Sequence, residues 1–155
     1  MNQKSALRVL TLGAVASMRS MSAPALVSSY LQQKQLAALA ESPLAWLGTG
    51  QAYIALRLAA AGELIADKLP GIPARIEPLP LLGRAMSGAV AGAALSDADG
   101  EDWVVGAALG TAAAVISAFG LYHLRRALTY GLGLPDPVVA LAEDGVALAA
   151  GKSQL

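Results

Sequence analysis

The chain has 155 residues, of which 55% are hydrophobic and only 14% are charged, and its formal net charge is zero. A water-soluble domain usually carries about 25% charged residues, so this composition predicts that lipid covers part of the surface. The zero net charge argues against a nucleic-acid interface. The absence of cysteine and the single histidine, His123, exclude disulfides, thiolate ligands and the usual multi-histidine metal sites.

Four stretches of the chain are apolar enough to form membrane-spanning helices, since a span needs about 20 mostly apolar residues. The first carries Arg19 near its centre, and Pro24 is expected to kink it because proline removes a backbone donor and crowds the preceding turn. The fourth holds no charged residue. The approximate limits of these stretches are residues 7–30, 45–66, 81–95 and 104–124.

The connections between these stretches are polar or rich in proline, which supports the division. Residues 69–80 contain four prolines and cannot be helical throughout, and residues 96–102 contain four acidic residues and no basic one. After the fourth stretch, Asp136-Pro137 predicts the start of a short last helix over about residues 137–150. Because this helix is too short to span and is interrupted by Glu143-Asp144-Gly145, we expect it to be interfacial or re-entrant.

Lysine and arginine are unevenly divided between the two sides of this arrangement. Lys34 is alone on one side, whereas the other side holds seven, namely Lys4, Arg8, Lys68, Arg75, Arg84, Arg125 and Arg126. The positive-inside rule then places both termini in the cytoplasm, with Tyr30, Trp46 and Trp103 at the outer interface. The sequence therefore predicts an all-α, multi-pass protein of the cytoplasmic or inner membrane, formed as a single domain over residues 1–155.

The first stretch has a competing interpretation as a secretory signal peptide, with Lys4 and Arg8 as its basic region. Arg19 interrupts the apolar run, however, and the following Ser-Ala-Pro-Ala is a loose cleavage match. A soluble all-α protein is the other alternative to a multi-pass membrane protein.

A short internal similarity links the first and third stretches. Arg19-Ser-Met-Ser-Ala matches Arg84-Ala-Met-Ser-Gly, and Leu69-Pro70 matches Leu134-Pro135 at the same spacing. Transporter folds are often built from repeats, and here two repeated two-span units would run parallel. Chance similarity in a chain rich in alanine, glycine and serine explains the match equally well.

Several segments of the chain combine charged residues with small ones in a specific order. These are Met18-Arg-Ser-Met-Ser-Ala-Pro-Ala-Leu26, Gly62-Glu-Leu-Ile-Ala-Asp-Lys-Leu-Pro70, Gly83-Arg-Ala-Met-Ser-Gly-Ala-Val-Ala-Gly92 and Leu141-Ala-Glu-Asp-Gly145. Together they resemble a family of uncharacterised bacterial membrane proteins, domain of unknown function 4126, over nearly the whole chain. The resemblance implies a bacterial inner-membrane location and no particular activity. The polar positions that match are Arg19, Glu63, Asp67, Lys68, Arg84, Glu143 and Asp144.

Charges inside the predicted spans mark the candidate site, because each costs about 2.5–3.5 kcal/mol at the centre of a span on insertion scales. Inside the spans, Arg19, Arg57 and Arg84 stand against Glu63 alone, which leaves an excess of two positive charges. This excess favours a small anion or an anionic lipid headgroup as the ligand. The predicted ligand-binding residues are Arg19, Ser20, Ser22, Arg84 and Ser87.

Acidic residues near the same depth are predicted to pair with these arginines or to act as a gate. Glu63 and Asp67 are four residues apart and so lie on one helical face, within reach of Arg84. The alternative is that the charges only pair with one another and that the serines serve as small packing residues. The charge-pairing or gating set is Glu63, Asp67, Lys68, Glu143 and Asp144.

Two functions are consistent with this pattern. The first is an anion or anionic-lipid transporter or channel, in which a homo-oligomer would give a pathway more room than four spans do. The alternative is a structural or assembly membrane protein whose intramembrane charges only fix helix packing. An enzyme that acts on a lipid is a further alternative, with Glu63, Asp67 and His123 as acid–base or metal groups at the cytoplasmic face. It is less favoured because no nucleophile is paired with a base, and we expect no cofactor or metal site.

Overall fold

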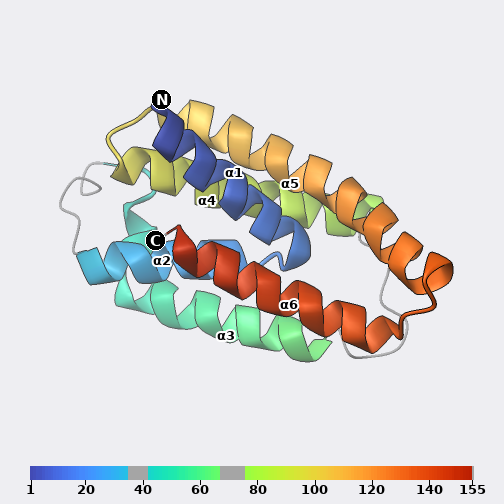
Figure 1. Ribbon diagram of the computed structural model, residues 1–155. Coiled ribbons are helices and arrows are strands. Elements are labelled where there is room, and N and C mark those ends of the chain that lie inside the picture. The colour runs from blue at the N-terminus through green and yellow to red at the C-terminus, as the bar shows by residue number, and fades with distance from the viewer. Residues whose placement is uncertain (35–41, 67–75, 155) are drawn as a thin grey trace.

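The computed structural model describes residues 1–34, 42–66 and 76–154, and these residues form helices and connections without any strand (Figure 1). The all-α prediction is therefore confirmed for the described residues. A short 3-10 helix, η2 (Ala45–Gly48), precedes α3, and a π-helical turn, η3 (Ala127–Gly131), extends α5. The main helices are α1 (Gln3–Met18), α2 (Ser22–Lys34), α3 (Gly50–Ala66), α4 (Pro78–Ala98), α5 (Trp103–Arg126) and α6 (Asp136–Ser153).

The predicted first span, residues 7–30, is wrong as a single helix. The chain leaves α1 at Arg19, whose backbone is extended, and α2 starts at Ser22. The end of α2 returns to the start of α1, because the Arg8 guanidinium carbon lies 5.3 Å from the centre of the Tyr30 ring. α1 and α2 therefore form a helical hairpin. Pro24 does not kink a span but lies in the first turn of α2, where a missing N–H breaks no helical hydrogen bond.

Glycine allows α1, α4 and α5 to pack closely. A Cβ atom added to Gly13 of α1 would lie 2.6 Å from the carbonyl oxygen of Gly110 in α5. A Cβ atom added to Gly88 of α4 would lie 2.8 Å from the Cβ of Ala114. The Gly88/Gly92 and Gly106/Gly110 pairs of the sequence thus face each other across the α4–α5 contact, as small residues at four-residue spacing do in close helix pairs.

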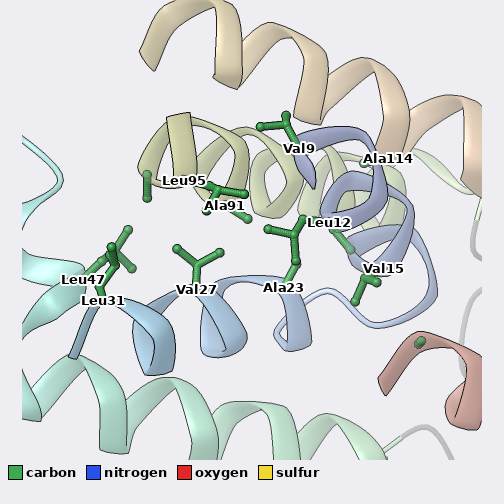
Figure 2. Close-up of a cluster of buried hydrophobic side chains, with 13 residues drawn as sticks. Val9, Leu12, Val15, Ala23, Val27, Leu31, Leu47, Ala91, Leu95 and Ala114 are labelled. Atoms are coloured by element: carbon green, nitrogen blue, oxygen red, sulfur yellow. The ribbon is translucent and has the colours of Figure 1, made fainter. Parts of the chain in front are cut away.

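The hydrophobic core lies where α2 packs against α1 and α4 (Figure 2). Leu12 of α1 lies close to Ala23 of α2, whereas Val9 points away from α2 and lies beside Gly92 of α4. Leu95 of α4 belongs to the same cluster. Most of the side chains buried here are small, and Ser17, Ser28 and Ser96 are as fully buried as the apolar residues. This core holds the hairpin inside the bundle.

Large apolar side chains lie mainly on the outside of the bundle. The exposed fraction is 83% for Tyr130, 80% for Leu79 and 71% for Ile116, although a soluble monomer rarely exposes extended apolar surface. Small and hydroxyl-bearing residues fill the inside instead. Other large hydrophobic residues more than half exposed include Leu7, Ile54, Leu58, Ile65, Leu82, Met86, Val104, Leu124, Leu132, Val138, Leu141 and Val146.

The other predicted spans correspond to helices with different limits. α4 extends beyond the predicted 81–95 because Pro78 occupies a first-turn position, where proline is tolerated. α6 is continuous through Glu143-Asp144-Gly145, so the predicted interruption is wrong. Among the described residues, Trp103–Gly131 is the one helix both long and apolar enough by composition to cross a membrane.

The hairpin changes the expected topology. Both termini lie at one end of the bundle, since Arg8 Nε of α1 donates to the Gln154 carbonyl at 2.6 Å (Figure 1). The loop between α4 and α5 lies at this same end, because Arg8 also bonds to both carboxylate oxygens of Asp99 at 2.7 Å. Its predicted place on the opposite side from the termini is therefore wrong. Lys34, which was predicted to lie opposite Lys4 and Arg8, ends α2 at the same end of the bundle as these two residues. The end of the bundle that holds both termini and the loop between α4 and α5 is called the terminal end below.

Candidate functional site

Most predicted site residues meet at the turn between α1 and α2, which consists of Arg19, Ser20 and Met21 and is called the junction below. Helix ends leave backbone groups without intrahelical partners, so the junction presents the last carbonyls of α1 and the first amides of α2. Side chains from α3, α4 and α6 bind these groups and Arg19.

Arg19 is bound by Asp144 of α6. Its Nε lies 2.8 Å from Asp144 Oδ1, and its second guanidinium nitrogen lies 2.7 Å and 2.8 Å from the two carboxylate oxygens. Arg19 is only 6% exposed, so the pair is nearly buried. The predicted positive excess omitted Asp144, because it counted only the charges inside the four predicted spans and the last helix was expected to be interfacial or re-entrant.

Arg84 of α4 binds the carboxyl end of α1. One of its guanidinium nitrogens donates to the Ser17 carbonyl at 2.8 Å and, more weakly, to the Met18 carbonyl at 3.5 Å. These carbonyls carry the negative end of the α1 helix dipole, which a buried cation stabilises. Ser87, one turn later, donates its hydroxyl to the Ser20 carbonyl. Arg84 and Ser87 thus bind the backbone on both sides of Arg19 and hold the junction in place.

Glu63 of α3 binds the amino end of α2. Its two carboxylate oxygens accept hydrogen bonds from the backbone amides of Ser20 and Met21, both at 2.7 Å. A carboxylate here satisfies amides that the helix leaves free and complements the positive end of the α2 dipole. Glu63 therefore contacts these backbone amides, whereas the sequence predicted a pair with Arg84.

The remaining predicted residues lie elsewhere. Asp67 and Lys68 lie outside the described residues. The Glu143 carboxylate lies 3.6 Å from Arg125 of α5, which also binds Asp136. Among the described residues, no group of three or more histidine and acidic side chains is placed to hold a metal ion.

The two Arg-x-Met-Ser segments are not equivalent in the structure. Arg19 lies in the break between two helices, whereas Arg84 lies inside α4. The segments instead contact each other, since Arg84 and Ser87 bond to the backbone around Arg19. Their similarity therefore does not reflect the predicted pair of parallel two-span repeats.

A groove of about 570 Å³ starts beside the junction at Ser22 and follows α2. Arg57 of α3 and Lys152 of α6 contribute positive charge, and none of the described residues that line the groove is acidic. Arg57 was recognised as a charge within a span, but sequence reasoning did not assign it or Lys152 to a site. A detectable signal was the spacing of Tyr53 and Arg57, because residues four apart meet on one helical face. The Arg57 guanidinium carbon lies 5.1 Å from the Tyr53 ring centre.

Comparison with known proteins gives one family. The model of a family described as domain of unknown function (DUF4126) matches residues 6–151. Neither curated proteins nor solved structures gave a match.

Proposed function

We propose that this chain, which belongs to the DUF4126 family, is a multi-pass integral membrane protein that binds an anionic lipid or another anion and moves it across the bilayer. The apolar surface of the bundle supports the membrane location. Large apolar side chains lie outside and small ones inside, which suits lipid as the surrounding solvent. The helix Trp103–Gly131 is long enough to cross, since about 20 residues suffice.

The hairpin is the observation that carries the transport proposal. α1 has 16 residues, about 24 Å of helix, so the hairpin enters the bundle from the terminal end and turns back before the far end of α5. Non-helical backbone at such depth is tolerated in membranes only where protein or a water-filled cavity surrounds it. In many transporters, broken helices of this kind direct their ends at the transported ion or substrate.

In the proposed mechanism, Glu63 acts as a gate at the junction. Its carboxylate occupies the amides of Ser20 and Met21, where an anionic ligand would otherwise receive hydrogen bonds. An arriving anion competes with Glu63 for these amides, and α3 is released from the junction when the anion succeeds. Arg84 stays on the α1 carbonyls and keeps the helix end in place.

We expect Glu63→Gln to increase transport several-fold in proteoliposomes, because a neutral amide competes less well with an anion for the two backbone amides. The measurement is the transbilayer movement of fluorescent phosphatidylglycerol and of inorganic phosphate, against protein-free vesicles. Glu77→Gln is the matched control, since this exposed carboxylate lies at the start of α4. Movement of neither probe by the wild type would contradict transport, and equal rates in Glu63→Gln and wild type would contradict the gate.

The absence of cysteine allows a direct test of the topology. Single cysteines at Gly100 and Ser153 are expected to react with an impermeant maleimide from one side of the membrane, and a cysteine at Tyr130 from the other. The reason is that the loop between α4 and α5 and the last residues of α6 both lie at the terminal end. In contrast, η3 follows α5 at the other end of the bundle. Labelling of Gly100→Cys and Ser153→Cys from opposite sides would refute this arrangement.

A structural or assembly role is the second candidate. The Arg19–Asp144 pair favours it, because a buried arginine bound bidentately by a carboxylate fixes the position of one helix against another. In this case the wild type moves neither lipid nor phosphate, and substitutions at the junction change only stability or assembly.

A further inference from the structure

The groove beside the junction has the shape of a ligand site. Its floor is α2, and its walls are α3 and α6, which both pack against α2 (Figure 1). The opposite side of α2 packs against α1 and α4, so the open side of the groove faces away from the core. A volume of about 570 Å³ falls within the usual range of ligand pockets, about 300–1,000 Å³.

The two cations of the groove lie at the same level along α2. α3 runs antiparallel to α2, since Gly50 lies beside Gln32 and Glu63 binds the amides of Ser20 and Met21. Arg57 is midway between Gly50 and Glu63 and therefore lies opposite the middle of α2. On the other wall, Gly151 packs against Leu26, which also places Lys152 beside the middle of α2.

The lining changes from polar to apolar along the groove. From the level of the cations to the terminal end, it consists of phenol and amide groups from Tyr30, Gln33 and Tyr53. Towards the junction, it consists mostly of Ala60, Ala61, Leu64 and Leu148, with Ser22 at the end. The stretch of α2 from Ser22 to Gln33 is about 16 Å long. A polar half with two cations and an apolar half correspond to the two parts of an amphiphile with a negative headgroup.

In a lipid environment, a negative headgroup is a favourable partner for the two cations of the groove. Arg57 and Lys152 both extend from the bundle surface, where a charge that faces hydrocarbon is costly. Arg57 contacts Tyr53 and lies over its ring, so it is held in place beside the groove. Tyrosine hydroxyls and the Gln33 amide supply further donors for phosphate oxygens.

We propose that this groove binds an anionic phospholipid, with its phosphate at Arg57 and Lys152 and an acyl chain along Ala60, Ala61, Leu64 and Leu148. The inference rests on the membrane location in the proposed function and names its ligand class and binding site. Lipid enters sideways between α3 and α6, because the open side of the groove faces the surroundings of the bundle. In this position the phosphate lies opposite the middle of α2, so the headgroup has to move along the groove before it can compete with Glu63 for the amides of Ser20 and Met21.

The test is lipid binding by the purified full chain in a neutral detergent, followed by native mass spectrometry and by thermal shift. The probes are phosphatidylglycerol, phosphatidylcholine and inorganic phosphate. We expect phosphatidylglycerol to bind, and its affinity to fall about tenfold or more when Arg57→Gln and Lys152→Gln are combined. The matched control combines Lys4→Gln with Arg126→Gln, which removes the same charge from exposed positions outside the groove and leaves the affinity within about twofold.

A second variant tests the acyl-chain half. Ala61→Phe fills the apolar part of the groove without changing any charge, and it is expected to weaken phosphatidylglycerol binding about tenfold. Because Ala61 is exposed, the melting temperature of the lipid-free protein is expected to stay nearly unchanged. Equal binding of phosphatidylcholine, equal loss in the control, or a phosphate shift as large as the lipid shift would each overturn the proposal. A negative lipid-binding result would rule out the groove as the lipid site without contradicting the transport and labelling results. The proposed function is contradicted only by the transport and labelling experiments themselves.

Discussion

Asp144→Ala is expected to lower the free energy of unfolding by about 3–5 kcal/mol, because it removes the carboxylate that binds the buried Arg19 guanidinium through two oxygens. Arg19 is 6% exposed and has two bonds of 2.7 Å and 2.8 Å to the Asp144 carboxylate from one nitrogen. The measurement is unfolding of the detergent-solubilised protein by SDS titration, followed by circular dichroism.

The control for this prediction is Asp136→Ala. Asp136 also binds an arginine, Arg125, but its side chain is 55% exposed, and exposed pairs contribute about 1 kcal/mol or less. Combining Asp144→Ala with Arg19→Met removes both charges, and we expect the double variant to recover most of the stability that Asp144→Ala loses. If Asp144→Ala and Asp136→Ala cost the same, the Arg19–Asp144 pair does not stabilise the bundle.

Gly110→Leu is expected to prevent close packing of α5 on α4 and to abolish the native fold, with Gly110→Ala already costing about 1–3 kcal/mol. Cβ atoms at Gly110 would meet the backbone carbonyl of Gly88, and backbone cannot move aside as a flexible side chain does. The same unfolding titration measures the effect, with the yield of folded protein for Gly110→Leu.

Gly120 of the same helix provides the control for this substitution. Apart from the nearby backbone of α5 itself, nothing among the described residues lies within 4 Å of a Cβ atom built at Gly120, so Gly120→Ala is expected to stabilise α5 by about 0.5–1 kcal/mol through its helix propensity. Equal effects of alanine at positions 110 and 120 would contradict the close α4–α5 contact.

Sequence reasoning located the helices and missed the hairpin for a physical reason. Residues 7–30 are apolar on both sides of Arg19, and apolar content does not distinguish one helix from two that turn back. The break depends on Glu63, Arg84 and Ser87, which bind the junction from segments far along the chain. The local signal was the combination of Ser20, Ser22 and Pro24, since these residue types favour a helix start.

At the candidate site, the sequence identified the residues but not the groups that they contact. Arg19, Glu63, Arg84, Ser87 and Asp144 were all identified as polar positions inside an apolar chain, where such residues are costly unless paired. Their individual partners were not predictable. Asp144 was placed in the charge-pairing set, but its helix was expected to be interrupted and interfacial or re-entrant, so no specific pair with Arg19 followed. Glu63 and Arg84 bind backbone at helix ends, and a sequence reveals a helix end only where the break is recognised.

The hairpin also has a consequence for the order in which the protein is built. α1 and α2 have 16 and 13 residues, so neither is long enough to settle alone in a bilayer as its own span. The groups that close their turn come 67 residues later at Arg84 and 125 residues later at Asp144. During synthesis from the amino terminus, the first segment made is therefore the last that can take its final place, because the carboxylate of Asp144 that binds Arg19 is present only after α6 has been made.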